Sequence, residues 1–400
     1  MSEICIPYGA YWSTPFSKWQ GSMAHLHSIE FAAHVGRQTL ASKNIPLDVF
    51  DYGVLGMSVP QRACFYGLPW LTGMMGAGHV GGPTISQACA TSARVMATAY
   101  AEIQMQAASC VLTICADRIS NGPHLYYPNP NGPGGTGRAE DWVMDNFAGD
   151  PYAHCDMTTT AENCAEKWKI STQEQHELVL RRYQQYQDAI KMEGDKNFQQ
   201  RYMSLPFDVP DSRYRKTLTT LHGDEGVTES TAAGLAKLKP VKEGGTVTFG
   251  GQTHPADGSA GMVITTPDKA KELSTKPEIK ISIESFGQSR VDMAYMPSAP
   301  VPATKRALQA ANISIEDITA IKSHNPFAVN DIIFSREMGV DVMSMNNYGC
   351  SLIWGHPQGP TGMRSIIELI EELVIKGGGY GLFQGCAAGD TAMAVVIRVS

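Results

Sequence analysis

Charged side chains are scarce in this chain of 400 residues: they make up 18% of it, and the net charge of −7 includes no long block of one sign. A protein that binds nucleic acid or an anionic membrane through a basic surface is therefore not expected. Apolar runs of the roughly 20 residues that span a bilayer are also missing, and the polar first residues do not resemble a signal peptide. We expect a soluble, cytoplasmic protein that can still bind an anionic small molecule.

Paired cysteine motifs are the second absence. The chain has nine cysteines, an odd number, with no CxxC pair and no Cys–His spacing of the zinc-binding type. This excludes a disulfide framework and a zinc ribbon, so we predict no metal site. Most of the cysteines should be small buried hydrophobic residues, and the question is which of them are reactive.

What the chain does contain is alternating strand and helix patterns with 43% hydrophobic residues and 39 glycines. Short apolar runs alternate with helical periods in both the first and the last third, which is typical of parallel α/β structure. In the first third the predicted strands are 48–57 and 110–116, and the predicted helices 59–74 and 92–106. In the last third the strands are 279–287, 319–329 and 381–399, and the helices 304–313, 330–338 and 363–375.

A different pattern separates these two regions. It opens with the loop-forming run NGPHLYYPNPNGPGGTG and continues with helices predicted at 158–168 and 172–191. The α/β pattern resumes at 245–250 and 260–266. We therefore predict an N-terminal half (1–118 with 251–270), an inserted helix-rich domain (119–250) and a C-terminal half (271–400).

Three glycine- or alanine-rich turns carry candidate chemistry. Cys89 lies in SQACATS, directly before an alanine-rich helix, and a helix N-terminus favours a thiolate. His356 lies in the turn GHPQGPTG and Cys386 in GCAAGD. Together they would supply a nucleophile, its activating base and a second thiol for proton transfer. Each alone is more often structural, as we expect for Cys350. Asp117 and Arg118 form either a buried pair or a substrate contact.

Five motifs in this order and spacing resemble those of the thiolase family (acetyl-CoA acetyltransferases and 3-oxoacyl-CoA thiolases) over nearly the whole chain. They are SQACATSARVMATAYAEIQ, MTTTAENCAEKWKISTQEQ (157–175), GGQTHPADGSAGMVI (250–264), GHPQGPTGMR and GCAAGD. The resemblance implies a thiolase fold: two similar βαβαβαββ halves forming a five-layer α-β-α-β-α core, in a homodimer or tetramer. The inserted loop domain would bind coenzyme A, cover the site and contribute to assembly.

The resemblance also implies a mechanism. An acyl group would be carried on Cys89, His356 would accept the thiol proton, and Cys386 would move the proton on carbon. Backbone N–H groups of Cys89 and Ala388 would form one oxyanion hole, and His324 of the HNPF segment would serve the second. Coenzyme A would be a co-substrate with no permanently bound cofactor, and further contacts to it or to the substrate are implied for Met157, Thr253 and Phe327.

Several residues depart from the usual family pattern, and together they predict a branched or aromatic acyl group, such as an aromatic succinyl-CoA, rather than acetoacetyl-CoA. The HNPF form resembles divergent thiolases that work with a small zinc-containing OB-fold protein. The departures are Asn325, Pro326, Ala387, Ala388, His254 and Trp354. The cluster Arg213, Arg215 and Lys216 is either a coenzyme A phosphate contact or a solvated basic face.

Two other functions stay open. A ketoacyl-synthase-like condensing enzyme generally places a second histidine where this chain has Cys386. A catalytically silent scaffold subunit with the same fold would tolerate the loss of Cys89 or His356, and this chain keeps both.

Overall fold

The computed structural model describes residues 3–191 and 197–400 and contains two main sheets. In the first sheet β10 and β5 pair antiparallel, while β5, β3 and β4 are parallel. Its order is β1 (Tyr11–Ser13), β10 (Ala256–Thr265), β5 (Cys110–Arg118), β3 (Tyr52–Gly56) and β4 (Thr84–Ile85), with β2 (Ser17–Lys18) also on β10. The second has the order β11 (Ile281–Arg290), β14 (Thr391–Val399), β13 (Gly379–Ala387) and β12 (Ile318–His324).

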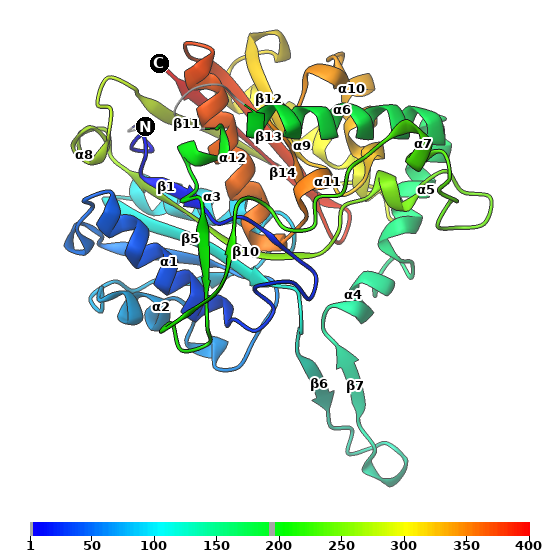
Figure 1. Cartoon of the computed structure of the whole chain (residues 1–400), viewed down its shortest axis with the longest axis horizontal. Coiled ribbons are helices and arrows are strands. Elements are labelled where there is room, and N and C mark those ends of the chain that lie inside the picture. The colour runs from blue at the N-terminus through cyan, green and yellow to red at the C-terminus, as the bar shows by residue number, and fades with distance from the viewer. Residues whose placement is uncertain (1–2, 192–196) are drawn as a thin grey trace.

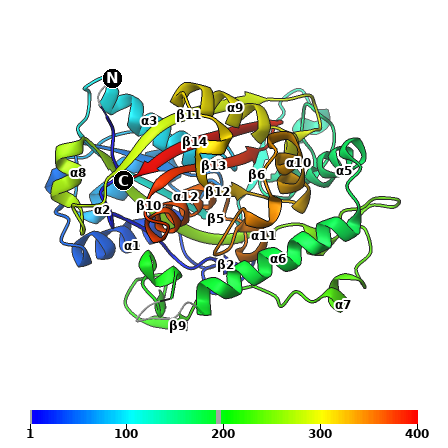
Figure 2. The ribbon, with the colours of Figure 1, turned by 90° about the horizontal axis from the view of Figure 1, so that it is seen from above.

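The helices complete five layers, which confirms the predicted α-β-α-β-α core (Figure 2). Helices α3 (Thr91–Gln104) and α12 (Gln358–Ile375) contact each other and lie between the two sheets. Helices α1 (Ser28–Ser42) and α2 (Gly67–Met75) pack on the outer side of the first sheet, and α9 (Pro300–Ala311) packs on the second, with α10 (Ala328–Met338) beside it. Because α12 is enclosed by both sheets, almost every side chain on it is buried.

The two halves differ by one strand. The first has the predicted order β1-α1-β3-α2-β4-α3-β5-β10, with the insertion between the last two strands. In the second, the place between α10 and α12 is taken by a 3₁₀ turn (Val342–Ser344) and the short helix α11 (Ser351–Trp354). Asn346 and Tyr348 there have positive φ values, which a strand does not allow.

Element boundaries also differ from the sequence prediction. The strand predicted at 48–57 covers only Tyr52–Gly56, because a 3₁₀ turn occupies Leu47–Val49. The helix predicted from residue 59 begins at Gly67, after Ala63 in the left-handed conformation. Residues 245–250 form no strand: they make one bridge, between Pro240 and Thr248, before a 3₁₀ turn.

The segment predicted as an insertion contains a projecting hairpin, a short helix beside it, and two longer helices that pack on the C-terminal half (Figure 1). The hairpin is β6 (His124–Tyr127) with β7 (Arg138–Asp141), followed by α4 (Met144–Ala148), α5 (Met157–Trp168) and α6 (Thr172–Lys191). The remaining elements are β8 (Phe207–Pro210), β9 (Thr217–Leu221) and α7 (Ala232–Leu235). Residues 192–196 of the predicted insertion, and residues 1–2 of the predicted N-terminal half, lie outside the described residues.

Buried ion pairs fix this segment to the C-terminal half. Arg182 on α6 donates to Asp331 on α10, with 2.9 Å between Nη2 and Oδ2. Asp224 accepts two hydrogen bonds from Arg364 on α12. All four side chains of these pairs are buried, so losing one partner would leave an uncompensated charge,. No helix among the described residues is long and apolar enough to cross a membrane.

Candidate active site

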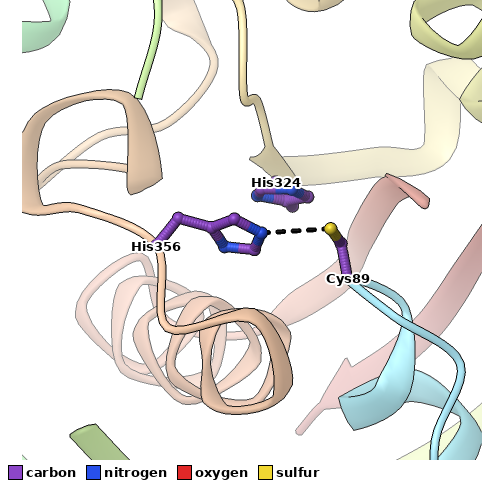
Figure 3. A group of neighbouring side chains, drawn as sticks. All are labelled: Cys89, His324 and His356. Atoms are coloured by element: carbon purple, nitrogen blue, oxygen red, sulfur yellow. Dashed lines mark hydrogen bonds between the residues drawn. The ribbon is translucent and has the colours of Figure 1, made fainter. Parts of the chain in front are cut away.

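Cys89 lies in a strained turn between β4 and α3. The preceding residue, Ala88, has φ +45°, a left-handed conformation that costs a non-glycine residue about 1–2 kcal/mol. The turn directs the Cys89 sulfur toward the loop before α12, where Sγ lies 3.1 Å from His356 Nε2 (Figure 3). Two residues from opposite halves of the sequence thus meet at hydrogen-bond distance.

The loop that carries His356 requires glycine at position 355. Gly355 has φ +93°, and a Cβ there would lie 2.8 Å from His254 Nε2 and 2.9 Å from Ala256 Cβ. On the other side of the ring, His356 Nδ1 lies 2.6 Å from Thr361 Oγ1. The Thr361 hydroxyl donates to the carbonyl of Pro357, so its oxygen must accept from His356 Nδ1–H. Nε2 therefore presents a lone pair to Cys89.

Both partners are neutral in the resting site. Burial raises the pKa of Cys89 to about 12; the N–H groups of Ala388 and Cys89 lower it, and Asp117 adds to the rise. Burial also holds the pKa of His356 well below its usual value. The predicted thiolate at the helix N-terminus is therefore wrong for the resting protein, because desolvation outweighs the helix dipole. Transfer of the thiol proton to His356 would place two charges in a desolvated site, where each charged form is disfavoured,.

His324, at the end of β12, lies directly over His356. Their ring centroids are 4.0 Å apart with an angle of 23° between the planes. His324 is fully buried, and burial lowers its pKa to about 3. Its Nδ1 lies 3.0 Å from Ser351 Oγ, while none of the described residues hydrogen bonds to its Nε2. This buried nitrogen faces the site without a protein partner, and such groups need explanation.

The single hydroxyl hydrogen of Ser351 controls which His324 nitrogen is protonated. Ser351 Oγ accepts from the Asn325 N–H and lies 3.0 Å from Asn325 Oδ1, which also accepts from the Leu352 N–H. With the proton on His324 Nδ1, this group of residues forms four hydrogen bonds: Nδ1–H donates to Ser351 Oγ, and the Ser351 hydroxyl donates to Asn325 Oδ1, in addition to the two backbone N–H bonds. With the proton on Nε2, the Ser351 hydroxyl can donate to only one of Nδ1 and Asn325 Oδ1, so three hydrogen bonds remain. The resting site therefore favours a lone pair on Nε2, and an acceptor oxygen bound there would restore the fourth bond to the other tautomer.

Cys386, at the end of β13, is fully buried. Its sulfur accepts a hydrogen bond from Asn330 Nδ2 at 3.2 Å, and Asn330 Oδ1 accepts from the Phe327 N–H. Burial holds the pKa of Cys386 well above its ordinary value, and the nearby Cys89 adds to the rise. Cys386 is therefore a protonated thiol beside the Cys89–His356 pair.

Asp117, near Cys89, forms hydrogen bonds with residues of both halves of the chain. Its carboxylate accepts from the N–H and hydroxyl of Ser58 and from the N–H of Gly359, at the start of α12. A Cβ at Gly359 would lie 2.8 Å from Asp117 Oδ2, so this contact depends on glycine. Of the two alternatives for Asp117 and Arg118, the buried pair does not form: adjacent strand residues face opposite sides, and Arg118 donates to the carbonyls of Leu26 and Asn121.

A cavity of about 410 Å³ leads to the Cys89–His356 pair. Met157, Thr253 and Phe327 line it, as does Ala388, so the structure places these four sequence-predicted residues together with the pair. Trp142 and Phe147, from the segment around β7 and α4, form another part of the wall. His324 and Cys386 do not line the cavity, although His324 lies within 4.8 Å of the reactive atoms of Cys89 and His356.

Other predicted substrate determinants lie away from this cavity. Trp354 is fully buried, with Arg364 over its ring at 4.2 Å and the Phe16 ring at 5.2 Å. His254 packs behind Gly355. Asn325 is buried and donates to Asp331 and to Cys350, which agrees with a structural Cys350. Trp354, His254 and Asn325 do not line the cavity, whereas Pro326 does, so the expectation that His254 and Trp354 shape the substrate pocket is wrong.

The basic cluster of Arg213, Arg215 and Lys216 also lies away from the cavity at Cys89. Arg215 and Lys216 line a separate groove of about 780 Å³ beside the C-terminal half of α1, and Arg213 does not line the cavity at Cys89. Phosphate contacts from this cluster to a molecule bound at Cys89 therefore have no support.

Sequence reasoning missed three polar residues that orient the site: Thr361, Ser351 and Asn330. The sequence positions of two of these residues weakly indicated their roles. Thr361 lies in the first turn of the helix after His356, and Asn330 is three residues after Phe327, where a capping side chain returns to the backbone,. Ser351 gave none, because its contact with His324 is made only in the folded chain.

Comparisons with known proteins agree with this fold and site. The thiolase N-terminal domain model matches residues 10–268 and the thiolase C-terminal domain model residues 277–399. The chain belongs to the thiolase family. It is an acyltransferase of the thiolase type.

Individual relatives are similar over nearly their whole length. The chain is 27% identical to the beta-ketothiolase BktB of Cupriavidus necator, covering 99% of both chains, and 26% identical to the human mitochondrial 3-ketoacyl-CoA thiolase, covering 96% of both. A crystal structure of the human mitochondrial enzyme matches with a TM-score of 0.90 at 25% identity, covering 100% of this chain and 99% of that one. A structure of that enzyme in complex with CoA matches with a TM-score of 0.88 at 26% identity, with 100% and 98% covered.

Proposed function

We propose that this protein is a thiolase that cleaves a 3-oxoacyl-CoA with free coenzyme A, or runs the reverse Claisen condensation, through an acyl group carried on Cys89. One observation carries the proposal: the Cys89 thiol faces the Nε2 lone pair of His356 at 3.1 Å, and both line the cavity. A nucleophile hydrogen-bonded to an oriented base is the arrangement that covalent acyl transfer needs.

In cleavage, His356 accepts the thiol proton while Cys89 Sγ bonds to the 3-oxo carbon. Collapse of the adduct breaks the C2–C3 bond, and the acyl group remains on sulfur. After Cys386 has protonated the departing enolate, His356 returns its proton to the Cys386 thiolate and is again a free base. Coenzyme A then gives its thiol proton to His356 and attacks the thioester, and His356 passes this proton to the Cys89 sulfur as it leaves. Because both resting groups are neutral, the charge separation of each step must be stabilised locally.

Two groups of donors are suited to that stabilisation. The N–H groups of Cys89 and Ala388 lie against the Cys89 sulfur and would donate to an oxyanion on a carbon bonded to it. His324 Nε2–H would donate to the thioester oxygen and stabilise the enolate that leaves as acetyl-CoA. An oxygen bound there favours the Nε2–H tautomer, because it accepts the fourth hydrogen bond and would repel the Nε2 lone pair of the other tautomer.

Cys386 would give its proton to the carbon of this enolate. A thiol kept protonated by burial is suited to this task,. Asn330, which donates to its sulfur, stabilises the thiolate left behind. In the condensation direction the same thiolate would remove the proton from acetyl-CoA.

For the substrate we propose a 3-oxoacyl-CoA with a bulky apolar or aromatic acyl group. The support is the cavity wall, where Trp142, Phe147, Phe327, Met157 and Met296 lie around the route to Cys89. Coenzyme A acts as co-substrate, with no permanent cofactor. We also propose a homodimer or tetramer, the domain limits given above, and a small zinc-containing OB-fold partner in the cell.

The experiment is a panel of acetoacetyl, longer linear, branched and aromatic 3-oxoacyl-CoA thioesters, each assayed with free coenzyme A by loss of the 3-oxo thioester. Cys89→Ser and Cys64→Ser serve as matched variants. We expect turnover by the wild type and Cys64→Ser, loss in Cys89→Ser, and a preference for bulky acyl groups. Full thiolysis by Cys89→Ser contradicts the nucleophile assignment, and turnover of acetoacetyl-CoA alone contradicts the substrate proposal.

A further inference from the structure

The side chains of Cys89, His324 and His356 form a compact cluster of metal-ligand atoms (Figure 3). Their sulfur and ring nitrogens all lie within 4.8 Å of one another. One thiolate and two imidazoles are donors that zinc and other borderline-soft divalent ions prefer, whereas magnesium and calcium require oxygen. The sequence showed no such group because the three residues are far apart along the chain.

The hydrogen bonds around the two histidines favour the tautomers that metal ligands need. Thr361 holds His356 Nδ1, and Ser351 holds His324 Nδ1, and these bonds favour a proton on each Nδ1. Each Nε2 therefore carries a lone pair: that of His356 accepts from the Cys89 thiol until the thiol proton is released, and that of His324 has no partner among the described side chains and backbone. Hydroxyl groups that fix the outer nitrogen of each imidazole are the second layer of contacts usual at metal sites.

We propose that the resting site binds a zinc-class divalent cation through Cys89 Sγ, His324 Nε2 and His356 Nε2. Binding forms one metal–sulfur and two metal–nitrogen bonds, and the thiol proton is released to solvent. The fourth position stays open toward the cavity that Cys89 and His356 line, which is also the entry path. The imidazole lone pairs lie in the ring planes, so the two rings must turn out of their 4.0 Å stack to converge on the ion.

Bound metal would block the reaction proposed above. It would occupy the Cys89 sulfur and the Nε2 atom assigned to the thioester oxygen, so inhibition should be reversible and competitive with the acyl-CoA. The metal proposal does not depend on that reaction, because metal binding is measured without turnover.

The test titrates cobalt(II), as the spectroscopic substitute for zinc, into the metal-free full-length protein with a non-thiol reductant present. We expect one ion per chain, one proton released, and a sulfur-to-cobalt charge-transfer band with the intense visible bands of a four-coordinate ion. Zinc should displace the cobalt. Absence of the charge-transfer band at saturating cobalt would overturn the proposal.

Variants identify the ligands. Cys89→Ser should abolish the charge-transfer band. Loss of an outer-layer contact typically weakens binding 10–100-fold, so Ser351→Ala should fall in this range and His324→Asn should weaken binding by about 100-fold or more. His324→Gln and thermal melting of each variant separate ligand loss from misfolding. Cys64→Ser and Cys155→Ser, at partly exposed free thiols, should bind like the wild type.

Either of two results contradicts the three-residue site. One is a charge-transfer band that persists in Cys89→Ser and disappears in Cys64→Ser or Cys155→Ser, which would assign the metal to a surface thiol. The other is wild-type affinity in both His324 variants that fold, which would leave only Cys89 and His356 as ligands.

Discussion

His356, in the loop before α12, and His324, at the end of β12, have similar local contacts but different surroundings. In each, a hydroxyl group holds Nδ1 and the ring is buried and neutral. His356 nevertheless contacts the Cys89 sulfur and lines the cavity, whereas His324 Nε2 is unpartnered among the described residues and lies outside the cavity wall.

The hydroxyl partners account for a second difference. Thr361 has its hydrogen committed to the Pro357 carbonyl, so His356 keeps one tautomer. The Ser351 hydrogen has two acceptors within reach, Asn325 Oδ1 and His324 Nδ1, so His324 can change tautomer. The contacts of His356 therefore fix one tautomer, which suits the base proposed above, whereas those of His324 allow its hydrogen-bonding role to change with what is bound.

The largest effect on activity should come from replacing His356. His356→Asn removes the base and should lower kcat/KM by about 10⁴-fold, the upper range for general base catalysis. The rate of Cys89 alkylation by iodoacetamide should fall as well, because the thiol keeps its proton. Steady-state kinetics and mass spectrometry measure the two effects. A loss below tenfold, in a variant that melts like the wild type, would contradict the role of His356 as base.

His324→Asn should have the next largest effect. It removes a donor to the thioester oxygen, which should lower kcat about 10²-fold, with a smaller change in KM. Alkylation of Cys89 should keep its wild-type rate, since the Cys89–His356 contact is intact. If alkylation slows as much as in His356→Asn, the two histidines do not have separate roles.

The two hydroxyls provide a finer comparison. Thr361→Val should lower kcat/KM about 10–100-fold, because a hydrogen bond to a group that becomes charged contributes about 1.5–3 kcal/mol. Ser351→Ala should lower kcat/KM about tenfold, since the hydrogen bond between the Leu352 N–H and Asn325 Oδ1 is kept,. Thr361→Ser keeps the hydroxyl and should retain activity. A larger loss of kcat/KM in Ser351→Ala than in Thr361→Val would contradict the assignment of the fixed tautomer to His356.

The smallest effect concerns stability and pH. The pKa of His324 is about 3 in the folded protein and 6.5 as its ordinary value, so between these pH values the unfolded chain binds the extra proton. This contribution to stability is present above pH 6.5 and is lost as pH falls, by at most about 1.4 kcal/mol per pH unit. Urea unfolding from pH 7 to 4.5 should therefore show a shallower decline in His324→Asn. An identical decline would contradict a buried neutral His324.

The candidate reactive residues could be found from the sequence because each lies in a recognisable local setting. Cys89, His356 and Cys386 are in small-residue turns, and His324 is in a segment of a family motif. The environment of each group could not be found in the same way. The predicted Cys89 thiolate was wrong because burial depends on both halves of the chain, and Trp354 packs on Arg364 because of the direction its side chain takes in the fold.

By itself, the sequence determined the alternation of strands and helices and the glycine turns, and it indicated the candidate reactive groups, because these follow from local spacing and residue chemistry. Only the tertiary structure decided that Cys89 and His356 meet at 3.1 Å and that hydroxyl groups hold the two histidines. It also decided which of the residues that depart from the family pattern line the cavity. The physical reason is that tautomers, desolvation and side-chain direction depend on partners brought together only when the two sheets pack around α3 and α12. The absence of CxxC pairs and of a zinc-type Cys–His spacing predicted no metal site, and the fold brings together a candidate metal-binding group from residues far apart in the sequence.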